Sequence, residues 1–220
     1  MYGMHDLFKD IRKRPGMYLK KVSITQLELI YMGFWLSLQI NNIPYENKSK
    51  KLFPLPFDYF NEFIICHYDT GSRALNSFSN ILRINNYDEE KSFEIFFELY
   101  DKFMALDIEY CQEIVLDKKN IEYNFENLFV RYIICQEETG EFTESIPIYE
   151  NPTEVYLVKI INKTGYLVLI KLNGILKSTG KIFASSQKAK KHIKSLFGDI
   201  SDLKWKKVKD YSIFDNIWYK

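Results

Sequence analysis

The spacing of apolar residues changes along this 220-residue chain. In the first half, apolar residues recur every three or four positions, which is the period of an amphipathic helix. In the last third, apolar runs have the length of strands and are separated by turn residues. The pattern predicts an α+β protein, with an N-terminal helical unit followed by a small antiparallel β-sheet module that contains one helix.

Five helices are expected in the first half, where the periodic stretches are bounded by Pro, Gly, Ser and Asn. Their approximate ranges are 4–13, 24–40, 57–64, 75–82 and 89–104. The last is the clearest, because Asp88 stands at the N-cap position and an unbroken apolar stripe follows. That stripe consists of Phe93, Phe96, Phe97, Tyr100, Phe103 and Met104. We therefore expect residues 1–104 to form a helical domain.

The last third predicts a β-β-β-α-β module over residues 150–220. The runs VYLVKII and YLVLIKL flank Asn-Lys-Thr-Gly, which is a typical hairpin signal. A third strand is expected over 175–183, and a helix is expected after Ser185 or Ser186 and before Gly198. The closing stretches LKWKKV and IFDNIWY resemble strands. Residues 105–149 hold strand-like pieces and are interpreted as an acidic connecting segment.

Net charge is only +1, but the charges are unevenly distributed. Residues 85–150 carry 17 acidic and 5 basic side chains, whereas residues 151–220 carry 5 acidic and 14 basic ones. Such blocks are typical of solvated faces, of surfaces for oppositely charged partners, or of two segments that face each other. The near-neutral total argues against a general nucleic-acid or membrane binder.

Signals for catalysis are missing from the sequence. There is no Gly-rich phosphate loop, no HExxH pattern, and the three His residues are scattered. Cys66, Cys111 and Cys135 are odd in number and widely spaced, which favours reduced thiols over a disulfide framework. No apolar signal core or membrane-length run is present. We therefore expect a cytoplasmic, non-enzymatic protein with no cofactor, no metal site and no membrane partner.

Two charged surfaces are candidates for partner binding. The first is acidic and lies on the predicted helix 89–104. It consists of Glu89, Glu90, Glu94, Glu98 and Asp101. The second is basic, is a candidate for nucleic acid, and consists of Lys188, Lys190, Lys191, Lys194, Lys204, Lys206 and Lys207. A third cluster is aromatic, with Phe57, Tyr59, Phe60 and Phe63, and we interpret it as core rather than as a contact patch.

The string IRKRPGMY, residues 11–18, lies between the first two predicted helices. Pro15 disfavours a helical conformation at Arg14, and Gly16 offers backbone freedom for a turn. We interpret the string as a helix–helix corner in which Met17, Tyr18 and Leu19 pack, and not as a binding loop. Arg12, Lys13 and Arg14 remain candidates for contact with an acidic partner or with the acidic middle of the chain.

The same string is the first of several motifs that this chain shares with a group of bacterial proteins. The chain contains, in the same order, the short motifs of a group of small RPGMY-motif bacterial proteins. The matching residues are Arg14–Tyr18, Ser23-Ile24 with Leu27, Gly33-Phe34, Phe57 with Phe60, Ser79–Ile81 and Phe96–Leu99. Over residues 8–104 the chain resembles immunity proteins of polymorphic or contact-dependent growth inhibition toxin systems. The resemblance implies a cognate protein toxin as partner and no catalytic residue.

The leading hypothesis is therefore a non-enzymatic immunity-type protein that binds and neutralises a bacterial toxin through an acidic and aromatic surface. Many antibacterial toxins are nucleases with cationic clefts, which an acidic surface attracts and blocks. The alternative hypothesis is a nucleic-acid-associated regulatory or defence protein that uses the basic C-terminal module. Strong salt dependence of binding to nucleic acid would distinguish this alternative from the immunity hypothesis.

Overall fold

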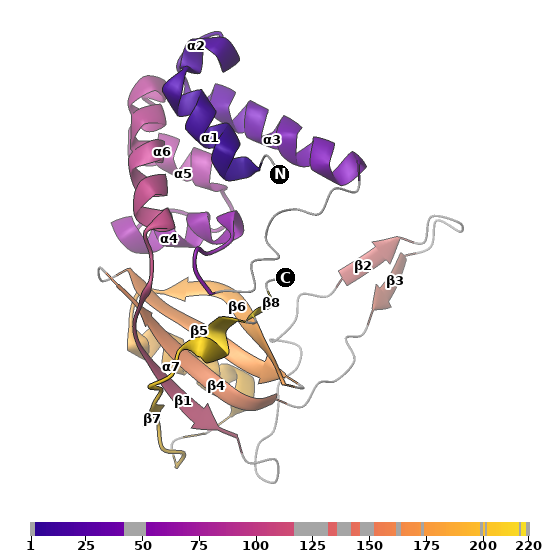
Figure 1. Cartoon of the computed structure of the whole chain (residues 1–220), viewed down its shortest axis with the longest axis vertical. Helices are drawn as coiled ribbons and strands as arrows, with labels where there is room; N and C mark the ends of the chain where they lie inside the picture. Colours follow the sequence, from indigo (N-terminus) through magenta and orange to yellow (C-terminus); the bar gives the residue numbers. More distant parts are fainter. Residues whose placement is uncertain are drawn as a thin grey trace. The chain divides into compact units, whose positions relative to one another are not determined.

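The computed structural model of the chain describes residues 3–41, 52–116, 132–135, 142–145, 152–161, 164–172, 174–198, 200, 202–215 and 217–218. It divides into two compact units. The helical unit consists mainly of residues 1–107, and the sheet unit consists mainly of residues 108–160 and 165–218. The predicted α+β class is confirmed (Figure 1).

The helical unit contains six α-helices in the part of the chain that is described. They are α1 (Met4–Lys13), α2 (Pro15–Tyr18), α3 (Ile24–Ile40), α4 (Phe60–Tyr68), α5 (Ser77–Ile84) and α6 (Glu89–Met104), and a 3-10 turn η1 (Phe57–Tyr59) precedes α4. All five helices expected from the apolar period are present. The additional helix, α2, is a single turn that begins at Pro15, where the missing N–H costs no helical hydrogen bond.

The helical unit has an aromatic core. Phe96 of α6 lies at its centre, with ring centroids 5.1 Å from Phe8, 5.4 Å from Phe60 and 5.1 Å from Phe78. These contacts join α6 to α1, α4 and α5. The aromatic cluster at residues 57–63 belongs to the same core, because Tyr59, Phe60 and Phe63 are buried. Its interpretation as core rather than as a contact patch is confirmed.

The helix–helix corner differs from its prediction in one respect. Of the three residues expected to pack, only Leu19 is buried, whereas Met17 and Tyr18 are exposed. The prediction was wrong for these two because α2 is too short to have a buried face. Arg12 pairs with Asp101 within the chain, with 2.6 Å between Nη1 and Oδ2, and its guanidinium lies over the Phe97 ring.

The sheet unit is built on six strands in the order β7-β1-β4-β5-β6-β8. Their ranges are β1 (Ile108–Val115), β4 (Pro152–Ile160), β5 (Gly165–Leu172), β6 (Ile175–Phe183), β7 (Lys206–Lys207) and β8 (Ile217–Trp218). All neighbours are antiparallel except β6 and β8. Strand β1 comes from the acidic segment 105–149. The segment also holds β2 (Tyr132–Cys135) and β3 (Phe142–Ser145), which pair with each other.

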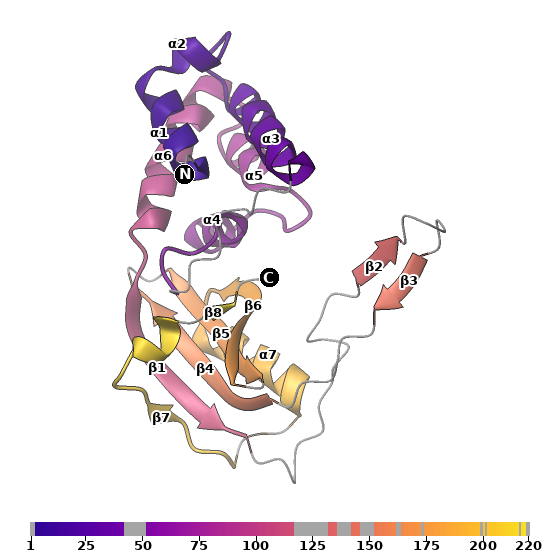
Figure 2. The same ribbon diagram turned by 45° about the vertical axis from the view of Figure 1, so that its right-hand side comes forward.

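Helix α7 (Ser186–Phe197) covers one face of this sheet (Figure 2). Its apolar residues Ala189, Ile193, Leu196 and Phe197 pack on alternate residues of the strands, which are Ile114, Val155, Leu157, Val168, Ile170 and Leu172. On the opposite face, the buried Tyr156 contacts Phe214 of the 3-10 turn η3 (Ser212–Asp215). The hairpin, the third strand and the helix are therefore confirmed. The two expected closing strands are present but short, because only two residues of each pair with the sheet.

Candidate partner-binding surfaces

Helix α6 carries all five predicted acidic partner-binding residues, but they have different environments. Glu89 and Asp101 interact within the chain, since Asp101 pairs with Arg12. Glu90, Glu94 and Glu98 are exposed, and no ion pair joins them to any cation in the described part of the chain. We call these three residues the acidic stripe, because their spacing of four places them on one face of the helix.

Glu89 caps a different helix from its own. Its carboxylate accepts hydrogen bonds from Ser23 Oγ (2.8 Å), from the Thr25 N–H (3.0 Å) and from Thr25 Oγ1 (2.7 Å). Desolvation tends to raise the pKa of Glu89, but the hydrogen bonds from Thr25 and Ser23, together with the charge of Lys21, lower it overall. Glu89 therefore stabilises the N-terminus of α3, where a negative charge also meets the positive end of the helix dipole.

Tyr87 lies beside the acidic stripe and was not among the predicted site residues. It is 71% exposed, immediately before the Asp88 cap of α6. Its φ is +64° and that of Asn86 is +52°, so two consecutive non-glycine residues adopt the left-handed conformation. A bulky residue in this region is strained. The Tyr87 N–H donates to the Leu82 carbonyl at 2.8 Å and holds the tyrosine at this position.

Tyr68 of α4 marks the other end of the acidic stripe. Burial is the main cause that raises the pKa of Tyr68, and the Glu98 carboxylate raises it further. The phenol therefore stays neutral and able to donate a hydrogen bond at physiological pH. With Tyr87 near Glu90 in the sequence and Tyr68 near Glu98 in space, the acidic stripe has a tyrosine at each end. The spacing of residues in the sequence does not indicate that either tyrosine lies at an end of the stripe.

The predicted basic residues all belong to the sheet unit. Lys188, Lys190, Lys191 and Lys194 are exposed on α7, and Lys204, Lys206 and Lys207 are exposed in the segment that follows it. The Lys190 ammonium lies 5.4 Å from the centre of the Trp205 ring, which joins the two groups. Lys206 and Lys207 form β7, opposite Glu113 and Gln112 of β1. Lys206 and Lys207 are successive strand residues, so their side chains point to opposite sides of the sheet. We call the four lysines of α7 with Trp205 the basic face.

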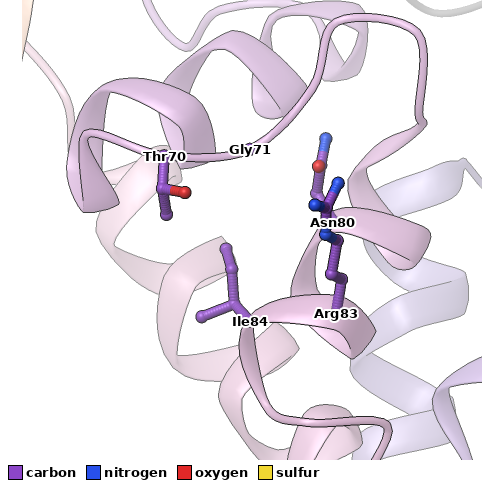
Figure 3. Close-up of a pocket in the computed structure, with 5 residues that line it drawn as sticks. All are labelled: Thr70, Gly71, Asn80, Arg83 and Ile84. Atoms are coloured by element: carbon purple, nitrogen blue, oxygen red, sulfur yellow. The ribbon is translucent and has the colours of Figure 1, made fainter.

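The helical unit also has a small cavity of about 270 Å³, lined by Thr70, Gly71, Asn80, Arg83 and Ile84. Thr70 and Arg83 lie on opposite sides of it (Figure 3). Asn80 is fully buried and orders the loop, since its amide donates to the carbonyl of Ser72 and accepts from the N–H of Ser72. Among the described residues that line the cavity, Arg83 is the only ionisable one, so these residues do not pair a nucleophile with a base.

The described cysteine and histidine side chains do not assemble into a reactive site. Neither Cys66 nor Cys111 is part of a disulfide. Burial, with the charge of Glu113, raises the pKa of Cys111 to about 12, so this thiol is neutral. Among the residues that the structure describes, no group of three or more His, Cys, Asp or Glu side chains is placed to bind a metal ion. No described helix has the length and apolarity needed to cross a bilayer.

Comparison with known proteins adds no identification. No family model matches the sequence, and no curated protein and no solved structure matches it significantly.

Proposed function

We propose that this protein is an immunity-type protein that binds a cognate bacterial toxin through the acidic stripe and Tyr87. The observation that carries the proposal is the exposure of Glu90, Glu94 and Glu98 on one helical face, with no ion pair to a described cation. Like charges four residues apart destabilise a helix by about 0.2–0.5 kcal/mol per pair. A cationic partner surface would relieve that repulsion.

The surface also offers an exposed aromatic residue, Tyr87, beside its charges. Exposed tyrosine supplies contact area at a low entropic cost, and charged residues around it steer the encounter. The resemblance of residues 8–104 to toxin-immunity proteins indicates the same class of partner. A toxin with a cationic substrate cleft is complementary to this surface, and occupation of the cleft would prevent substrate from entering.

The test begins with the full chain as bait in its source organism at moderate salt. A stoichiometric protein partner is expected. Expressed alone, that partner should arrest growth, and co-expression of this chain should restore growth. A partner that is harmless to cells would contradict the proposal.

The acidic stripe is tested with matched charge reversals. Glu94→Lys should slow association with the partner about tenfold at low salt, because it places a repulsive charge in the contact surface. Asp202→Lys changes the net charge equally at an exposed position of the sheet unit and should leave association unchanged. Equal rates for the two variants would remove the acidic stripe from the binding site.

A second candidate function is nucleic-acid binding by the basic face. The contact between Lys190 and Trp205 favours it, because it places an aromatic ring among lysines, as single-strand binders do. Titration of single-stranded oligonucleotide should then quench Trp fluorescence, and affinity should fall steeply with added salt. Binding that is unaffected by Lys190→Ala would argue against this function.

A further inference from the structure

Helix α3 presents an unusually apolar face to solvent. Leu29 is 67% exposed, Met32 49%, Leu36 52% and Ile40 70%, and Trp35 beside them is 38% exposed. In Figure 1 the C-terminal part of α3 extends beyond α1. Scattered exposed apolar residues are normal on protein surfaces, but a contiguous group marks an interaction site. We call Leu29, Met32, Leu36 and Ile40 the α3 seam.

The spacing of the α3 seam fits a second helix. Positions 29, 32 and 36 follow the alternation of three and four residues that places side chains along the contact line of paired helices. Gly33 lies between them, and a Cβ added at Gly33 would meet no atom within 4 Å. A glycine inside a helix costs about 1 kcal/mol relative to alanine, but its bare backbone lets another helix approach closely.

The absence of charge on this face favours an uncharged partner surface. Residues 29–41 contain no Asp, Glu, Lys, Arg or His. A partner that carries many charges finds nothing complementary on this face. A second copy of the same face does, because a twofold interface brings the same patch of both copies together, and residues near the axis lie beside their own images. A charge near the axis would then meet a like charge, and the seam has none.

We propose that two copies of this chain associate through the α3 seam, with α3 packed against its counterpart. This self-association does not depend on toxin binding, since it uses a helix other than α6. The seam from residue 29 to residue 40 is only about 17 Å long at 1.5 Å per residue. It is therefore smaller than the roughly 800 Å² per partner of a standard interface. A weak dimer is expected, with a dissociation constant on the order of 10 µM.

The experiment is sedimentation equilibrium of the full chain from about 1 to about 200 µM, which spans the expected dissociation constant. The wild type should pass from monomer to dimer over this range. Leu36→Glu and Leu36→Lys should each remain monomeric, because each places two like charges at the interface. The matched control is Val115→Glu, at an exposed apolar position of β1, which should dimerise as the wild type does.

Mixing the two Leu36 variants tests whether the occupant is a second copy. An equimolar mixture of Leu36→Glu and Leu36→Lys should recover dimers, since opposite charges now meet across the seam. Met32→Glu and Met32→Lys replace the pair if either Leu36 variant fails to fold by circular dichroism. A wild type that is monomeric at the highest concentration would overturn the proposal and assign the face to another protein. Dimers that persist in both charged variants would also overturn it.

Discussion

Glu89 shows how a residue on a correctly predicted helix can have an unexpected role. The helical period places it with the exposed acids of α6, and as a partner-binding candidate. Its carboxylate instead holds the hydroxyl groups of Ser23 and Thr25. These residues are 66 and 64 positions away in the sequence, so no local pattern reports the contact. Glu89 therefore has a structural role, whichever residues of α6 a partner contacts.

Replacement of Glu89 by Gln should lower the stability of the protein in a pH-dependent manner. At pH 7 the variant loses charged hydrogen bonds and should be about 1 kcal/mol less stable than the wild type. Because the folded-state pKa of Glu89 is lowered from 4.5, its contribution is present above that pH. The contribution is then lost as the pH falls through the folded-state pKa.

Urea unfolding of both proteins between pH 7 and pH 3 measures this difference. The two stabilities should converge at the acid end of the range. Asp202→Asn is the matched control, since it neutralises an exposed acid of the sheet unit and should have little effect at any pH. A difference between wild type and Glu89→Gln that stays constant with pH would exclude the carboxylate as its source.

Helix boundaries were predictable where a polar residue caps the first turn. Ser23 and Gln26 have the sequence spacing of a capping box, and the Ser23 Oγ does accept from the Gln26 N–H at 3.2 Å. The Gln26 side chain, however, accepts from the Lys21 N–H rather than completing the box. For α7 two serines were possible caps. The structure selects Ser185, whose side chain accepts from the Lys188 N–H.

This choice of cap makes a prediction for α7. Ser185→Ala should destabilise the protein by about 1 kcal/mol, because a free N–H at the first turn loses its acceptor. Ser186→Ala is the matched control, since Ser186 lies inside the helix, where alanine is at least as favourable as serine. Thermal unfolding of the two variants at one pH compares them directly. Equal losses, or a larger loss for Ser186→Ala, would show that the cap is not at Ser185.

At the scale of the whole molecule, the chain combines two units with different kinds of core. The helical unit packs aromatic rings around Phe96, and the sheet unit packs aliphatic residues between α7 and one face of its strands. Each core is formed by residues of its own unit, which is the usual condition for independent folding. The boundary at Asp107–Ile108 falls between α6 and β1.

A fragment of residues 1–107 should therefore fold by itself. Its circular dichroism spectrum should be helical and its thermal unfolding cooperative, because the contacts of Phe8, Phe60 and Phe96 all lie within the fragment. Phe96→Ala in the same fragment should abolish the cooperative transition, since removal of a buried ring costs about 3–5 kcal/mol. A gradual, non-cooperative unfolding of the unmodified fragment would show that its core needs the rest of the chain.

The sequence by itself determined the α+β class, the five longer helices of the first half, the hairpin and the helix of the sheet unit. These features repeat over a few residues, so apolar period, caps and turn residues report them directly. Tertiary structure alone decided which acids are engaged and which are exposed, where Tyr87 and Tyr68 lie, and that Lys190 meets Trp205. It also decided that part of a largely apolar helix, α3, is left exposed. Such features depend on contacts between residues far apart in the chain, which no local pattern contains.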